Sequence, residues 1–335
     1  MNFAISFPAQ EDAMTFDQPE KLSTPTGATL SLRIRRAEEP ARGVLQINHG
    51  LAEHSARYER FAAFMAARGF DTYAHDHRGH GYTKAPGAPL GHFGSEPAAD
   101  KVIADILAVH DRIAEDRPSL PVIVFGHSMG GLIALNFILR HPLRAKAAAI
   151  WNANFSAGIE GRAARAILAW ERFRLGSDVP SRLLPRLTFG AWNNQVPDRR
   201  TEFNWLSRDE AEVEKYIADP LCGWPASVGM WRAVFDFIFL GADDRNFVTV
   251  PRDMPFNLTG GAADPSTGDG KSVTKLAERL RKMGFSDVVS NIYAETRHES
   301  LNELNRDIIM EDFATWALRQ ADRFQAENLV RRNTT

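Results

Sequence analysis

The sequence predicts an α/β fold, in which helices cover both faces of a mostly parallel sheet and a helical insertion interrupts the pattern. Short apolar runs alternate with amphipathic segments, and this alternation is typical of parallel strands that are joined by helices. The alternation stops between about residues 152 and 254 and resumes after them. The chain has 335 residues, of which 44% are hydrophobic and 24% charged, a globular composition that can bury a sizeable core.

Seven short apolar runs are the candidate strands. They are Thr29–Ile34, Gly43–Asn48, Phe70–His75, Pro121–Phe125, Lys146–Trp151, Pro255–Thr259 and Val288–Tyr293. Because no helix separates the first two runs, we expect them to pair as an antiparallel hairpin. Five amphipathic segments are the candidate helices: Tyr58–Arg68, Pro97–Ile113, Met129–Arg140, Ser272–Met283 and Asn302–Gln325.

We interpret residues 152–254 as a cap that lies over the carboxyl ends of the strands. The cap separates a first part of the core, residues 1–151, from a second part, residues 255–335. Six of the seven tryptophans lie in the cap or at its leading edge, at positions 151, 170, 192, 205, 224 and 231. These aromatic side chains either form the core of the cap or line a binding site beneath it.

The distribution of charge argues against a nucleic-acid partner. Forty Lys and Arg residues balance 42 Asp and Glu residues, and no basic run is longer than a pair.

The single cysteine, Cys222, cannot form an internal disulfide or a cysteine metal cluster. The first residues lack the basic and apolar regions of a signal peptide, and no window of about 18 uncharged apolar residues is present. We therefore expect a cytoplasmic protein.

A serine nucleophile is predicted where a candidate strand runs directly into a candidate helix. The sequence Gly126-His127-Ser128-Met129-Gly130 joins these two elements. In such a turn the serine has strained backbone angles, and its hydroxyl projects above the sheet with the helix N-terminus beneath it. Glycines two positions before and after the serine remove side chains that would collide. Because the flanking strand and helix supply the required context, Ser128 is the candidate nucleophile.

The candidate base is found by excluding other histidines, and the candidate acid by its place after a strand. In proteins with this nucleophile turn, the catalytic residues follow the order serine, acid, histidine along the chain, and only His141 and His298 follow Ser128. His141 ends the helix that Ser128 begins and would lie about 20 Å away, so His298 remains. The acid should follow the penultimate strand, where Asp264 stands at the carboxyl end. Asp269 is the alternative, although its glycine-rich surroundings suit a turn.

The backbone N–H groups of Leu51 and Met129 are the candidate donors for the oxyanion of an acyl-transfer reaction. The strand Gly43–Asn48 ends in His49-Gly50-Leu51, where the chain turns sharply. Met129 directly follows the candidate nucleophile. Each donor of this type is typically worth about 2.7–4 kcal/mol of transition-state stabilisation.

Other polar side chains near these turns are either substrate contacts or structural groups. Glu53, His54 and Arg57 either contact a polar head group or pair with one another. Three histidines are also close together in the sequence: His75, His77 and His80. Glycine-rich turn chemistry explains this stretch, so we predict no metal site. The candidate substrate contacts are His49, Glu53, His54, Arg57, Trp151 and Phe155.

Four motifs carry a family resemblance. They are HGLAEHSARY at 49–58, DHRGHG at 76–81, GHSMGG at 126–131 and RHESLNE at 297–303. Together they resemble the monoacylglycerol lipase and lysophospholipase branch of the alpha/beta-hydrolases, often labelled serine aminopeptidase-like hydrolases, over about residues 25–325. The resemblance implies an eight-stranded hydrolase-fold core, a lipid-facing cap, no cofactor and carboxylic-ester hydrolysis. It also supports the roles given above to the serine, the aspartate, the histidine and the two backbone donors.

Some segments refine this resemblance. Asn204–Val213 and Asp219–Gly223 in the cap look like bacterial members of the family. Trp151–Asn154 replaces a small, proline-containing segment, so we expect an altered pocket entrance. Thr267–Gly270 enlarges the loop after the candidate acid. Both departures bear on substrate preference and leave the triad untouched.

The leading hypothesis is a serine hydrolase that forms an acyl-enzyme with lipids of one acyl chain, either monoacylglycerols or lysophospholipids. Apolar side chains in the cap favour a hydrocarbon chain and would also allow transient contact with the surface of the inner membrane. They are Phe155, Ile159, Leu168, Trp170, Phe173, Leu183, Leu187 and Phe189. A carboxylesterase for small esters is the first alternative.

Three further functions are weighed against this hypothesis. Prolyl aminopeptidases carry His-Gly-Gly-Pro-Gly at the oxyanion turn, where this chain has His49-Gly-Leu-Ala-Glu53. Epoxide hydrolases and haloalkane dehalogenases have an aspartate at the position of Ser128. A ligand-binding protein without activity would often lack a triad member, whereas this chain has all three candidates.

Overall fold

The computed structural model describes residues 16, 18–197 and 199–333. Within them, eight strands form one sheet in the order β1-β2-β4-β3-β5-β6-β7-β8. β2 is antiparallel to β1 and β4, and the other neighbouring strands are parallel. The strands are β1 (Glu20–Ser23), β2 (Thr29–Arg35), β3 (Gly43–Asn48), β4 (Phe70–His75), β5 (Val122–His127), β6 (Ala147–Trp151), β7 (Phe256–Gly261) and β8 (Val288–Tyr293). The eight-stranded, mostly parallel sheet is therefore confirmed.

All seven predicted strands are present, but the predicted hairpin is wrong. β2 pairs with β1 and β4, whereas β3 lies between β4 and β5. The reason is burial, because β3 is buried along its whole length and a central position covers both of its faces. β1 was not predicted, because this four-residue edge strand is at most half-buried and has no continuous apolar run.

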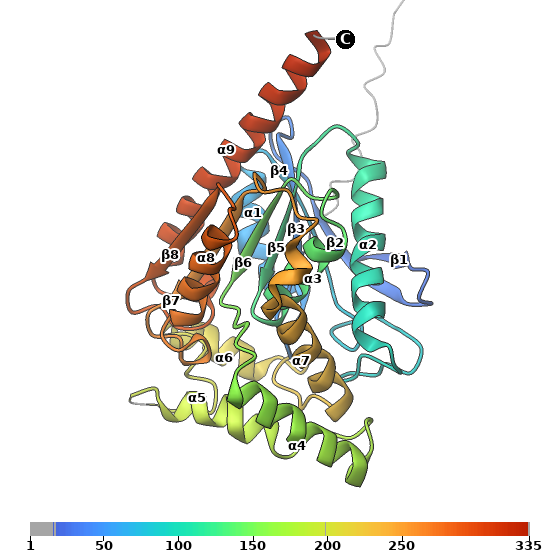
Figure 1. Cartoon of the computed structure of the whole chain (residues 1–335), viewed down its shortest axis with the longest axis vertical. Helices are drawn as coiled ribbons and strands as arrows, with labels where there is room; N and C mark the ends of the chain where they lie inside the picture. Colours follow the sequence, from blue (N-terminus) through green and yellow to red (C-terminus); the bar gives the residue numbers. More distant parts are fainter. Residues whose placement is uncertain (1–15, 17, 198, 334–335) are drawn as a thin grey trace, which may run out of the picture.

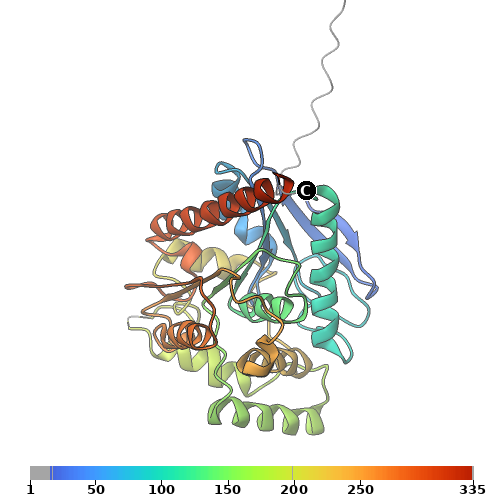
Figure 2. The ribbon, with the colours of Figure 1, turned by 45° about the horizontal axis from the view of Figure 1, so that its top comes forward.

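Helices cover both faces of the sheet (Figure 1). α1 (Glu59–Ala66) and α9 (Arg306–Asn333) pack on one face. α2 (Ala98–Asp116), α3 (Met129–Arg140) and α8 (Lys271–Lys282) pack on the other. In Figure 2, the red α9 and the orange α8 lie on opposite sides of the carboxyl-terminal strands.

Two apolar layers hold the helices on the sheet. Val124 and Phe125 are neighbours in β5 but belong to different layers, since successive residues of a strand point to opposite faces. Val124 is in the layer that contains Ile133 of α3, and Phe125 is in the layer that contains Phe313 of α9. Strands of this kind need continuous apolar runs, which is why the sequence marks them so clearly.

The segment between β6 and β7 adds helices to the fold. α4 (Ile159–Leu175) and α5 (Ala191–Asn194) lie beyond the carboxyl ends of the strands in Figure 1, and η2 (Arg186–Gly190) and α6 (Glu210–Ala218) belong to the same segment. α7 (Val228–Ala242) instead packs on α3 in the larger core layer. The division of the chain at residues 152 and 254 stays a prediction.

Two predictions concern the ends of the chain. The first 15 residues, in which we expect no signal peptide, lie outside the described part. α9 begins at Arg306, later than predicted, because Ser300–Asn302 forms a separate 3-10 turn, η5. Among the described helices, α9 included, we find none with the combined length and apolar character needed to cross a bilayer.

A buried ion pair joins the turn after β4 to α2. Arg78 Nε is 2.7 Å from Asp105 Oδ2, and the two side chains are 1% and 2% exposed. Thr24 and Thr26, both between β1 and β2, donate to Asp105 Oδ1. Arg78 also donates to the carbonyl oxygen of Phe93. Because both charges are desolvated, removing one partner leaves the other uncompensated.

Arg78→Met should lower the free energy of unfolding by about 3–5 kcal/mol, because Asp105 would stay buried without its cation. Urea denaturation followed by circular dichroism measures this loss. Arg323→Met is the control, since Arg323 pairs with acids only at the surface and should change stability by less than about 0.5 kcal/mol. A loss below about 1 kcal/mol in Arg78→Met would contradict the argument.

Candidate active site

The turn between β5 and α3 holds Ser128 in a strained conformation. Ser128 has φ 56° and ψ −120°, which is rare for a residue with a Cβ. A Cβ on Gly126 would lie 2.0 Å from the carbonyl oxygen of Gly130, and a Cβ on Gly130 would lie 2.0 Å from that of Asn48. Glycine is therefore required at both positions by the close approach of strand, turn and helix.

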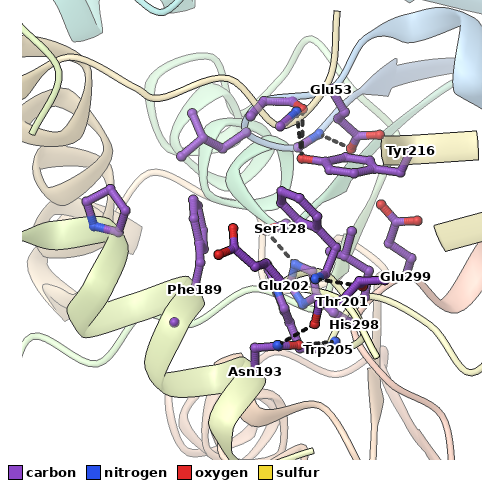
Figure 3. A pocket seen from close by; sticks show the side chains of 18 of the residues that line it. Glu53, Ser128, Phe189, Asn193, Thr201, Glu202, Trp205, Tyr216, His298 and Glu299 are labelled. Carbon is purple, nitrogen blue, oxygen red and sulfur yellow. Dashed lines mark hydrogen bonds between the residues drawn. The ribbon is translucent and has the colours of Figure 1, made fainter. Parts of the chain in front are cut away.

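His298 lies between Ser128 and Asp264. Its Nε2 is 2.9 Å from Ser128 Oγ, a contact drawn in Figure 3, and its Nδ1 is 3.1 Å from Asp264 Oδ2. Asp264 follows β7, and His298 lies in the loop between β8 and η5. The structure thus brings together the predicted nucleophile, base and acid. The alternatives are elsewhere: Asp269 is exposed, and His141 follows the far end of α3.

Two residues that the sequence did not single out complete the surroundings of Asp264. The Ser266 backbone N–H and hydroxyl donate to Asp264 Oδ1 at 3.0 Å and 2.7 Å, and Asn152 Nδ2 donates to Oδ2 at 3.2 Å. Burial would raise the pKa of Asp264, but His298 and these hydrogen bonds outweigh it and hold the pKa below its ordinary value. Asp264 is therefore a carboxylate at neutral pH, able to orient the imidazole.

The segment expected to alter the pocket entrance instead supports the acid. Asn152 accepts a hydrogen bond from the Ser300 hydroxyl, and Asn154 donates to the carbonyl oxygen of Ser266. Neither asparagine lines the cavity beside Ser128. Asn152 and Asn154 thus help to hold the loop that bears Asp264.

The turn after β3 lies directly against the nucleophile. A Cβ on Gly50 would be 3.5 Å from Ser128 Cβ and 2.7 Å from Glu53 Oε1. Leu51, the next residue, lines the same cavity as Ser128. Met129 begins α3, whose first N–H groups carry partial positive charge. Two separate backbone segments therefore flank Ser128, as the prediction of Leu51 and Met129 as oxyanion donors requires.

A cavity of about 590 Å³ lies between Ser128 and the cap. Figure 3 shows Phe189 of the cap across from Ser128 and His298, with Trp205 beside His298. The Trp205 ring lies 4.8 Å from the His298 ring, centroid to centroid. Further lining residues from the cap are Pro185, Arg186, Asn193, Arg199, Leu206, Tyr216 and Trp224. The cap therefore supplies most of the apolar wall.

Most of the predicted substrate contacts do not line this cavity. Glu53 does, but His49, His54, Arg57, Trp151 and Phe155 are not part of its described lining. Two of these assignments have to be corrected. Trp151 is 1% exposed and packs between aromatic rings of the core, with its Nε1 donating to Asn257. Phe155 packs against Gly241 of α7. The contact is so close that a Cβ on Gly241 would lie only 2.4 Å from the Phe155 ring.

The polar residues after the turn His49–Leu51, the predicted oxyanion turn, pair with one another. Arg57 Nη1 is 2.6 Å from Glu53 Oε2 and 2.6 Å from Glu299 Oε1. His127 Nδ1 is 3.5 Å from Glu53 Oε1, and its Nε2 is 3.0 Å from the carbonyl oxygen of His298. Burial opposes these charges, but Arg57 and His127 hold the pKa of Glu53 well below its ordinary value. These contacts support the alternative in which Glu53 and Arg57 pair with one another and do not contact a polar head group.

The histidine-rich stretch is buried and uncharged. Burial lowers the pKa of His75 to about 4 and that of His80 to about 3, so both are neutral at neutral pH. His49 joins this group, and its Nε2 accepts the backbone N–H of His77 at 3.0 Å. These contacts give the histidines a structural role beneath the oxyanion turn.

In the described part of the chain, one set of metal-ligating side chains lies near the cap. The ligand atoms of His54, Asp219 and Cys222 are all within 4.8 Å of one another. His54 Nε2 is already 2.8 Å from Asp219 Oδ2, and burial raises the pKa of the Cys222 thiol. The hydrogen bond between His54 and Asp219 joins the turn after β3 to the end of α6.

Fold and site together define a class of proteins. A serine on a strand–turn–helix elbow, with a histidine and an aspartate after later strands of a mostly parallel sheet, is the arrangement of the alpha/beta-hydrolases. Residues 39–305 match the family described as serine aminopeptidase, S33. This chain belongs to that family of serine hydrolases, which confirms the resemblance carried by the four motifs.

Individual relatives agree with this family. The chain is 27% identical over 286 residues to a monoglyceride lipase of Homo sapiens, covering 85% of this chain and 86% of that protein. It is 27% identical over 279 residues to a monoacylglycerol lipase of Mycolicibacterium smegmatis (strain ATCC 700084 / mc(2)155), covering 82% and 88%. A thermostable carboxyl esterase from Bacillus coagulans has the same fold, with a TM-score of 0.82 and 22% identity over 91% of this chain and 98% of that one.

Ser266→Ala should weaken the support of Asp264 and raise the pKa of its carboxyl toward the ordinary value. A carboxyl with a lowered folded-state pKa stabilises the fold above its unfolded pKa of about 3.9, and this stabilisation is lost as the pH falls. The unfolded pKa, at which this loss begins, is the same in both proteins, so the variant should be less stable than the wild type at about pH 6 and should lose less stability as the pH falls. Urea unfolding between about pH 3 and pH 6 tests this. Superimposable stability profiles would contradict the role given to the Ser266 hydroxyl.

Proposed function

We propose that this protein hydrolyses the ester bond of lipids with a single acyl chain, with monoacylglycerols as the main substrate class. The chain is a carboxylic ester hydrolase. The observation that carries the proposal is the contact of Ser128 with His298 at one side of a cavity whose other side is an aromatic cap. Two relatives that align over more than four-fifths of the chain, named monoglyceride lipase and monoacylglycerol lipase, support it.

The geometry supports a two-step acyl transfer. Ser128 Oγ attacks the ester carbonyl carbon while His298 Nε2 accepts the hydroxyl proton, and Asp264 stabilises the resulting imidazolium. The tetrahedral oxyanion forms beside the N–H groups that we assign to Leu51 and Met129. Its collapse breaks the ester C–O bond, and His298 returns the proton to the departing alcohol. Water then attacks the acyl-enzyme by the same route and releases the fatty acid.

The cavity suits a hydrocarbon chain. Its volume of about 590 Å³ is within the usual range for small-molecule sites, and such sites are mainly lined by apolar and aromatic groups. Phe189, Trp205 and Trp224 provide such groups here. Arg186 and Arg199 also line the cavity, and their positive charge favours lysophospholipids as a second substrate class, because a guanidinium matches a phosphate.

The wild-type protein should release fatty acid from monooleoylglycerol, and Ser128→Ala should lower the rate at least about 1,000-fold because the nucleophile is gone. Titration of released fatty acid measures both rates, and lysophospholipids and short p-nitrophenyl esters complete the substrate panel. Ser286→Ala, which changes an exposed serine, is the control. The proposal fails if the wild type releases no acid from any lipid, or if Ser128→Ala remains active.

The exposed face of α4 supports a contact with lipid surfaces. Ile159 and Phe173 are 87% and 89% exposed, and Trp170 is half exposed. A contiguous exposed apolar patch usually marks an interaction surface, and at 3.6 residues per turn these three side chains lie on one face of α4. Basic residues accompany them on the same helix: Arg162, Arg165, Arg172 and Arg174. We infer a transient, peripheral contact of this face with a membrane that contains anionic lipids.

Phe173→Glu should reduce binding to vesicles of phosphatidylglycerol and phosphatidylcholine by about tenfold, because it places a charge in the apolar face. Co-sedimentation with the vesicles measures this binding. Leu143→Glu is the matched control, since Leu143 is 77% exposed but lies just beyond the end of α3 that is far from Ser128. Equal binding of the two variants would rule out α4 as the contact.

A further inference from the structure

Ala52, just after the proposed oxyanion donor Leu51, has a left-handed backbone conformation. Its φ of 56° is unfavourable for a residue with a Cβ, and such conformations persist only where the surroundings hold them. Ala52 is also buried, with 2% of its surface exposed. The residue therefore needs partners that keep the turn in this shape.

The partners of Ala52 come from the cap. Tyr216 Oη donates to the carbonyl oxygen of Ala52 at 2.9 Å, and the Gly223 backbone N–H donates to the same oxygen at 2.9 Å. The Gly223 N–H is also 3.1 Å from Tyr216 Oη, so the three groups form one compact set. Tyr216 is 6% exposed and lines the cavity beside Ser128 (Figure 3). A cap side chain thus reaches the backbone of the oxyanion turn.

The other end of the turn is held by the core. Gly50 N–H donates to Glu53 Oε1 at 2.6 Å, and His49 Nδ1 is 2.8 Å from the carbonyl oxygen of Gly50. That carbonyl belongs to the same planar peptide unit as the Leu51 N–H, so fixing one atom fixes the direction of the other. The His49 tautomer is set as well, because its Nε2 accepts the His77 N–H and leaves Nδ1 as the donor.

We propose that Tyr216 is a positioning residue that holds the Leu51 N–H in the direction needed to receive the oxyanion. The inference rests on the proposed function, in which Ser128 forms an acyl-enzyme. The core fixes the Gly50 side of the turn and the cap fixes the Ala52 side, so the oxyanion site is complete only with the cap in place. Because oxyanion donors must already point at the developing charge, a small loosening of the turn weakens the transition state more than the substrate complex.

Tyr216→Phe tests this, because it removes the hydroxyl and keeps the ring. We expect kcat for monooleoylglycerol to fall about tenfold while KM changes less than about twofold, since only the transition state uses the oxyanion donors. The inhibition constant of an oleyl trifluoromethyl ketone, whose adduct carries an oxyanion, should rise by a similar factor. Tyr293→Phe is the matched control, since its hydroxyl donates to Asp312 and lies on β8, the edge strand of the sheet, away from the turn after β3.

A second variant covers the case in which Tyr216→Phe does not fold. Ala52→Gly suits the left-handed conformation but confines the turn less, so it should keep the unfolding temperature and lower kcat about threefold. The inference is overturned if Tyr216→Phe keeps its kcat, or if KM rises with kcat and ketone affinity unchanged, which would make Tyr216 a substrate contact. Failure of the proposed function is a different result, namely wild-type protein that releases no fatty acid or activity that survives Ser128→Ala.

Discussion

The left-handed conformation of Ser128 is the constraint on which the site depends. It directs the hydroxyl away from the sheet, and it requires the strand, the turn and α3 to approach so closely that Gly126 and Gly130 admit no Cβ. The same approach places the end of β3, and hence the turn at Gly50, against the nucleophile. One strained residue therefore fixes the relative positions of nucleophile and oxyanion turn, and the parallel sheet provides the rigid frame that keeps the strain in place.

Buried polar contacts also fix the positions of the other parts of the site. Arg57 joins Glu53, which holds the oxyanion turn, to Glu299, which follows the catalytic histidine of the proposal. The backbone N–H of His298 is 3.4 Å from the carbonyl oxygen of Trp205, so the cap also contacts the histidine loop. Nucleophile elbow, oxyanion turn, histidine loop and cap are thus parts of one hydrogen-bonded assembly. Such preorganisation is what acyl transfer requires, because the donors then need no rearrangement when charge develops.

The strands and the nucleophile turn could be predicted from the sequence, whereas the positions and contacts of most side chains in the site could not. The G-x-S-x-G spacing and the strand–helix alternation are local consequences of sterics and burial, so Ser128 and seven of the eight strands were identifiable. Trp151 was misassigned because an aromatic side chain can belong either to the core or to a pocket. Trp151 and Ala149 alternate along β6 and point to the same face of the sheet, the face that packs on α9, and this pattern would have indicated a core position. Ser266 supports Asp264 through a turn whose geometry is set by tertiary packing.

Identification of the acyl-enzyme tests the central claim most directly. Wild-type protein would be mixed with monooleoylglycerol, quenched in acid during turnover, digested and analysed by mass spectrometry. The account predicts one oleoyl group in ester linkage, located on the peptide that contains Ser128, and its disappearance once the substrate is exhausted. An oleoyl group on another residue, or steady release of fatty acid without any covalent adduct, would contradict it.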